Sequence, residues 1–299
     1  MENILFGSLK TSELWSGLKY LLHHMSWMEA QEACKRSDTA IVPVGTLHGH
    51  GPTPLGIDAI SVERLAQEVA KRTGLLTLPV LPYGENEDQK RYPGTIAIRD
   101  EVIEELYMDI CRSLRRNGIK KVIFLNGHGG NRKALMNTGF RVRELGMLIA
   151  IPEWYVISRM MMKDLFPGPR PGFFSELAVS MAILGTDVAD LRSGGYKGEW
   201  GPTENTTLNV KKIYGEKIVP LGRGSISASG VNYKGAEITI PMDSWEVDLP
   251  SPPELDKNKL EELRKKGEEI IRRVTDYLVE FAKDFEKVDV SVFLKGSQA

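Results

Sequence analysis

The stretch KKVIFLNGHGGN, residues 120–131, decides the fold class of this chain. Its first half is an apolar run that is typical of a fully buried strand. Its second half is a glycine-rich turn, and a helical pattern follows it. A strand, a helix and a further strand in this order are typical of a parallel sheet with helices on its faces. We therefore expect an α/β fold, a three-layer α/β/α sandwich with a mainly parallel sheet.

The segments on both sides continue this alternation of strands and helices. They are predicted as strands at 39–44, 75–84 and 147–152 and as helices at 58–72, 100–116 and 131–145. Asp100 is the expected N-cap of the helix that starts there, and Gly118 is its expected C′ residue. Because such sheets bind their ligands at the carboxyl ends of the strands, residues that follow the strands are the first candidates for a site.

The pattern changes in the second half of the chain. Residues 217–250 contain short strand-like runs with glycine turns, whereas 252–286 form one long charged helical pattern with an apolar stripe. That stripe predicts packing on the sheet or on a neighbouring subunit. We expect one domain over residues 1–299, with an N-terminal extension (1–24), a β-rich insertion (217–250) and a C-terminal helix (252–286).

The charge balance argues against nucleic acid as a partner. The 299 residues include 39 Lys+Arg and 40 Asp+Glu, which gives a formal net charge of −1, and basic tracts are short. No apolar run reaches about 18 residues and the N-terminus lacks an export signal, so neither a membrane span nor secretion is expected. The two cysteines do not indicate a disulfide framework. We expect a cytoplasmic protein.

The loop GTLHGHGPTPLGID, residues 45–58, has the composition of a metal site. Residues two apart in an extended segment point the same way, so His48 and His50 can face one point. Asp58 lies at the start of a predicted helix, where an anion is favoured. Two imidazoles and a carboxylate are a ligand set for zinc, manganese or iron. The loop holds no lysine or arginine that would oppose a dication.

A further histidine supports this interpretation. His128 follows the buried strand, so three of the five histidines lie at predicted strand ends, while His23 and His24 lie in a helical segment and are expected to be structural. The alternative for residues 45–58 is a plain surface loop. For residues 126–131 it is a phosphate-binding turn at a helix N-terminus, but the lysine and the glycine spacing of the known phosphate motifs are missing.

Three ordered motifs resemble those of the creatininase (creatinine amidohydrolase) family. Residues 43–58 are similar to its first motif, P-x-G-x-x-E-x-H-G-P-H-L-P-L-G-T-D, and residues 84–95 to its second, G-x-S-x-x-H-x-x-F-P-G-T. The third motif, NGHGGN, is intact at 126–131, and residues 198–202 resemble a later G-x-x-G-D-P element. The resemblance spans residues 25–215 and the final helix.

The resemblance implies an α/β/α fold and a hydrolytic site with one or two metals. Carried over by position, the family's ligands correspond to His48, His50, Asp58 and His128. Glu176 is the fifth candidate, and a shifted alignment would put Ala178 in its place. The implied cofactor is a divalent transition metal, zinc or manganese with iron as a further option. The implied assembly is a homo-oligomer, often a hexamer in this family.

The candidate site departs from the family's pattern. The family has glutamate where His48 stands and histidine where Gln89 stands, and no histidine lies between 129 and 299. The first motif is also one residue shorter around Thr53. The site is therefore either altered for another substrate or decayed. Exchanging glutamate for histidine replaces one metal donor by another, which favours altered chemistry.

A metal-activated water suits attack on a lactam, a formamide or a ketone. Glu176 or Glu204 is the candidate general base. Asn126, Asn131 and Trp200 are candidates for binding the substrate, although asparagine is also common in turns. The resemblance favours hydrolysis of a C–N bond in a small cyclic or formyl amide. Two alternatives stay open: opening of a carbocyclic polyol ketone of the inosose type, and a non-catalytic, metal-free scaffold.

Overall fold

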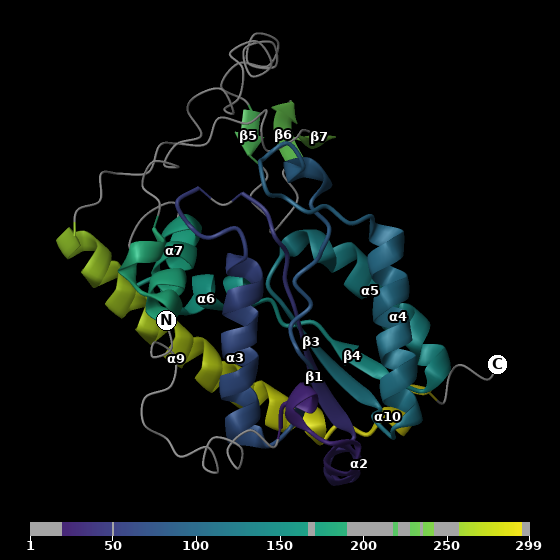
Figure 1. Ribbon diagram of the computed structural model, residues 1–299. Helices are drawn as coiled ribbons and strands as arrows, with labels where there is room; N and C mark the ends of the chain where they lie inside the picture. Colours follow the sequence, from purple (N-terminus) through teal and green to yellow (C-terminus); the bar gives the residue numbers. More distant parts are fainter. Residues whose placement is uncertain are drawn as a thin grey trace.

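The computed structural model describes residues 20–49, 51–166, 171–189, 218–220, 228–233, 236–241 and 257–294. Its centre is a four-stranded sheet in the order β2-β1-β3-β4, in which every neighbouring pair of strands is parallel. The strands are β1 (Thr39–Val44), β2 (Leu76–Thr77), β3 (Lys121–Asn126) and β4 (Leu148–Ala150). Figure 1 shows β1, β3 and β4 side by side in the middle of the molecule.

Helices cover both faces of this sheet, so the predicted three-layer sandwich is confirmed (Figure 1). One core lies under α3 (Ile57–Thr73), α6 (Trp154–Met161), α7 (Pro171–Leu184) and α9 (Lys257–Glu286). The other lies under α2 (Trp27–Arg36), α4 (Asp100–Arg116) and α5 (Arg132–Arg141). The shorter elements are η1 (Leu22–His24), η2 (Glu87–Gln89), η3 (Gly129–Asn131), η4 (Val142–Leu145), η5 (Thr186–Val188) and α10 (Val290–Leu294).

The two central strands feed both cores because alternate side chains of a strand point to opposite faces. Ile41 and Ile123 enter the core under α3 and α9, whereas Val42 and Phe124 enter the core under α4 and α5. Every residue of β1 and β3 is buried. A parallel sheet covered on both faces requires such continuous apolar runs, and this explains why the strands were recognisable in the sequence.

Two predicted boundaries are wrong for identifiable reasons. The strand expected at 75–84 ends after Thr77, because Pro79 and Pro82 carry no N–H for the ladder. Asp100 is the first residue of α4 rather than its N-cap, which is Arg99, and the Asp100 carboxylate instead pairs with Lys133 at 2.7 Å. Gly118 has the left-handed φ of 92° expected just past the end of this helix.

The second half of the chain contains the predicted strands and long helix. A separate antiparallel sheet is formed by β5 (Ile218–Pro220), β6 (Ala228–Tyr233) and β7 (Ala236–Pro241). The apolar stripe of α9 packs within the chain, against α3, α6 and α7. Gly267 allows the closest approach, because a Cβ there would lie 2.0 Å from the backbone oxygen of Ala178. Among the described residues, no helix combines the length and apolarity needed to cross a membrane.

Candidate metal centre

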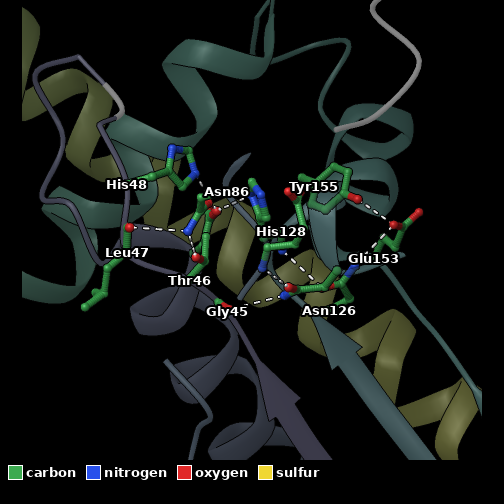
Figure 2. A network of polar contacts seen from close by, with 12 residues as sticks. Gly45, Thr46, Leu47, His48, Asn86, Asn126, His128, Glu153 and Tyr155 are labelled. Carbon is green, nitrogen blue, oxygen red and sulfur yellow. Dashed lines mark hydrogen bonds and ion pairs between the residues drawn. The ribbon is translucent and has the colours of Figure 1, made fainter. Parts of the chain in front are cut away.

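The sheet order puts a topological switch point at the carboxyl ends of β1 and β3. The chain leaves β1 toward β2 on one side, and later returns to form β3 on the other side of β1. Ligands bind at such a switch point in open α/β sheets. Val44 and Asn126, the last residues of the two strands, are paired in register, and the loops that follow them carry His48 and His128. Figure 2 shows both imidazoles at this edge of the sheet.

Three predicted ligands meet at this switch point. Asp58, the second residue of α3, has its Oδ2 3.0 Å from His48 Nε2 and 2.9 Å from His128 Nδ1. The two imidazole rings lie 4.7 Å apart between centroids, and all three side chains are buried. One ligand atom from each residue fits within 4.8 Å of the others. Two imidazoles and one carboxylate at this separation match the three protein ligands of a catalytic metal site, whose fourth position is generally taken by water or substrate.

Two glycines, one after each central strand, allow the start of α3 with Asp58 to pack directly against both strand ends. A Cβ on Gly45, directly after β1, would lie 2.4 Å from the backbone of Ala59. A Cβ on Gly127, directly after β3, would lie 2.1 Å from the backbone oxygen of Asp58. The N-terminus of α3 is therefore clamped between the two strand ends, and only glycine at both positions permits this approach.

The cluster carries more negative charge than its surroundings stabilise. Burial lowers the pKa of His48, but the hydrogen bond that its ring N–H donates to Asp58 and the charges of Asp58 and Glu176 outweigh it, so this pKa is raised. Burial, reinforced by the charge of Asp58, raises the pKa of Glu176 to about 8. Both shifts favour the protonated forms of His48 and Glu176, and a bound dication would compensate the same negative charge. The residues present therefore fit a divalent metal.

Of the other predicted ligands and general bases, Glu176 lies within the described residues. Glu176 lies on α7, partly buried, and its charge acts on Asp58 and His48. It does not belong to the tight cluster, which among the described residues consists of His48, Asp58 and His128. His50, Trp200 and Glu204 lie outside the described residues. Their predicted roles therefore stay predictions.

Asn126 and Asn131 are buried and use their amides to join the loops around the cluster. The Oδ1 atom of Asn126 accepts from the backbone N–H of His128 at 3.1 Å, and its Nδ2 donates to Glu153 at 3.3 Å. Asn131 accepts from the backbone N–H of Glu85 at 3.1 Å and donates to the carbonyl of Gly45 at 3.2 Å. These contacts support a structural role for both residues, and their binding of substrate stays a prediction.

Several supporting residues were not singled out from the sequence. Asn86, fully buried, donates to the side chain of Thr46 and to the carbonyl of Ile96, which joins the first and second motifs (Figure 2). Glu153 receives hydrogen bonds from Asn126, Arg132 and Tyr155. The only available signal for Asn86 was its place within the 84–95 motif, and Glu153 carried none.

Comparisons with known proteins agree with this geometry. The family model described as creatinine amidohydrolase matches residues 23–175, about half of the chain. The 3-dehydro-scyllo-inosose hydrolase of Thermotoga maritima is 34% identical over 107 residues, which cover 35% of this chain and 34% of that protein. The creatinine amidohydrolase of Pseudomonas putida is 30% identical over 114 residues, which cover 36% and 44%. The chain thus spans less than half the length of these curated relatives.

A solved structure shows that the fold is shared beyond the matched segment. The crystal structure of a creatinine amidohydrolase (creatininase) has a TM-score of 0.63 with 18% sequence identity, over 90% of this chain and 99% of that chain. The three-layer arrangement, the motif-bearing loops and the family model all agree. The chain belongs to the creatininase (creatinine amidohydrolase) family.

Proposed function

We propose that the protein is a metal-dependent hydrolase that acts on a small cyclic or formyl amide and breaks a C–N bond. The observation that carries this is the convergence of His48, Asp58 and His128, all buried, at the switch point of the sheet. A divalent metal at this position would supply a Lewis acid for a carbonyl oxygen and a bound water whose pKa is lowered to about 7.

The protein's own groups have separate tasks in this proposal. Asp58 Oδ2 lies within 3.0 Å of one nitrogen of each imidazole, so the three donor atoms converge on one point where a metal would be held. Glu176, whose charge interacts with Asp58 and His48, is our candidate for taking a proton from the attacking water. The three side chains of the cluster are buried, and this shielding from bulk water strengthens each electrostatic interaction in the site.

A second function is supported by one comparison. The relative named 3-dehydro-scyllo-inosose hydrolase is matched at 34% identity, and opening of a carbocyclic polyol ketone also requires a polarised carbonyl and an activated water. The first step is therefore the same for the C–N and C–C candidates. A substrate panel separates the two candidate functions. Lactams, formamides and a cyclic polyol ketone are offered to the zinc- and manganese-loaded protein, and the compound that is consumed identifies the bond that is broken.

Metal content tests the proposal directly. Protein purified without chelators is expected to carry one or two transition-metal ions per chain, zinc or manganese, because the cluster offers three donors in a buried, anionic setting. Elemental analysis measures the stoichiometry, and removal of the metal is expected to abolish hydrolysis until the metal is restored. A content below about a tenth of an ion per chain, with no uptake on reconstitution, would favour the metal-free scaffold instead.

Substitutions of His48 test whether the site is altered for another substrate or has decayed. His48→Ala is expected to lower zinc affinity by about tenfold or more, because it removes one of three donors. His48→Glu restores the family residue and adds a carboxylate, so zinc binding is expected to be kept or strengthened while turnover of the natural substrate falls. Zinc titration of both variants beside the wild type and beside His24→Ala, a histidine outside the cluster, decides this. Wild-type affinity in His48→Ala would support the decayed site.

We further propose a homo-oligomer, a hexamer as the family resemblance implies. Four large apolar side chains are exposed on the neighbouring helices α4 and α5: Val102, Leu106, Met136 and Phe140, of which Phe140 is 70% exposed. Exposed apolar surface of this kind marks protein contacts. Light scattering at micromolar concentration measures the mass, and a monomer would contradict the proposal.

A further inference from the structure

His128 presents its two ring nitrogens to different surroundings. Nδ1 lies 2.9 Å from Asp58 Oδ2, inside the cluster. Nε2 lies on the far side of the ring, where it is buried and has no hydrogen-bond partner among the residues that the structure describes. A buried polar atom left without a partner costs about 1–3 kcal/mol, so this nitrogen requires an explanation.

A carboxylate lies next to that nitrogen. The Oε2 atom of Glu85 is 2.6 Å, and His128 Nε2 is 2.7 Å, from one and the same point, which is the position that a Cβ on Gly130 would take. The two atoms therefore lie within a few ångströms of each other. A side chain at residue 130 would crowd both the carboxylate and the imidazole.

The Glu85 carboxylate is held in this position from several sides. Its other oxygen, Oε1, accepts from the backbone N–H of Glu87 at 2.7 Å. Its backbone N–H donates to Asn131 at 3.1 Å, and its carbonyl oxygen lies beside Gly130. The side chain is partly buried. These contacts fix the backbone and one carboxylate oxygen, and they direct Oε2 toward His128.

We propose that Glu85 is a positioning residue that accepts a hydrogen bond from the Nε2–H of His128 and so holds this ring with Nδ1 toward the metal. The inference rests on the proposed metal site. A histidine that binds metal through one nitrogen almost always donates its other N–H to a carboxylate, a carbonyl or a water, and this fixes both the tautomer and the orientation of the ring. Glu85 supplies that carboxylate, and the glycine at 130 leaves the path between them open.

Zinc affinity of Glu85 variants tests the proposal. Glu85→Ala is expected to lower zinc affinity by about tenfold to a hundredfold, the usual effect of losing such a partner. Glu85→Gln keeps the length and an acceptor oxygen, so it is expected to recover part of this loss. Glu87→Gln is the matched control, since that exposed carboxylate pairs with Lys90, and it is expected to bind zinc like the wild type.

A spectroscopic readout separates positioning from general stability. Long-range ¹⁵N–¹H spectra of the zinc-loaded wild type are expected to show His128 protonated at Nε2 and bound to metal through Nδ1, with that signature weakened in Glu85→Ala. Coordination through Nε2 in the wild type, or zinc affinity within twofold of wild type in both Glu85 variants, would overturn the inference alone. If the wild type takes up no zinc, the proposed function fails and the inference fails with it. Thermal melts show whether Glu85→Ala has folded, and Glu85→Gln decides the matter if it has not.

Discussion

Asp58→Asn is expected to abolish tight metal binding and hydrolysis together. One oxygen of this residue, Oδ2, contacts both His48 and His128, and among the described residues the tight cluster contains no other carboxylate. Losing a partner of a metal ligand already costs about tenfold to a hundredfold in affinity, so the loss of a direct anionic ligand is expected to exceed a hundredfold. Asparagine has nearly the same shape, which keeps the packing at the start of α3.

Zinc titration and turnover of Asp58→Asn, beside a matched variant, isolate this effect. Glu101→Gln also removes a negative charge from the first turn of a helix, but it is exposed and lies on α4. Each variant loses the favourable interaction of an anion with a helix N-terminus, about 0.3–1 kcal/mol, and only Asp58→Asn is expected to lose metal. Wild-type zinc affinity in Asp58→Asn would remove the basis of the proposed function.

Gly127→Ala is expected to destabilise the fold by about 3 kcal/mol and to weaken metal binding at the same time. The added Cβ would lie 2.1 Å from the backbone oxygen of Asp58 and 3.1 Å from the side chain of Val62. Neither can retreat easily, because α3 is packed into the core through Val62 and Leu65. Overpacking of this kind costs about 1–3 kcal/mol or more, and any relief moves Asp58 out of the cluster.

Denaturant unfolding and zinc titration measure both effects. Gly139→Ala is the matched control: this glycine lies within α5, and a Cβ there would meet nothing within 4 Å. The control is expected to be neutral or stabilising by up to about 1 kcal/mol. An unchanged unfolding midpoint for Gly127→Ala would show that α3 can shift, and the clamp between the two strand ends would then be of little consequence.

The sequence was sufficient for the parts of this protein where one local rule dominates. Apolar runs without interruption predicted β1 and β3, since both faces of the sheet are covered. The prolines at 79 and 82 were visible as well, but the run around them was apolar enough to suggest a longer strand than the ladder permits. Helix α9 was predicted from its stripe, although the choice between the sheet and a second subunit required the packing.

The sequence predicted the three candidate metal ligands, but not the residues that hold the surrounding loops together. His48, Asp58 and His128 follow strands that are neighbours in the sheet, so topology alone brings them together. The side-chain hydrogen bonds of Asn126, Asn131 and Asn86 join loops that are far apart in sequence, and no local pattern encodes them. Glu85 was likewise hidden, because its relation to His128 depends on the missing side chain at Gly130.

The parallel pairing of β1 and β3 also has a kinetic consequence. His48 and Asp58 follow β1 in the chain. His128 follows β3, which comes after β2 and α4 in the sequence and pairs with the other edge of β1. Such long-range parallel pairing is slow to form, because closing the intervening loop costs entropy first, and we expect it to be incomplete in the folding transition state. A metal ion therefore has little to bind in the folding transition state. Metal binding is therefore expected to stabilise the native state by slowing its unfolding. Stopped-flow unfolding with and without zinc measures this effect as a longer lifetime of the native state.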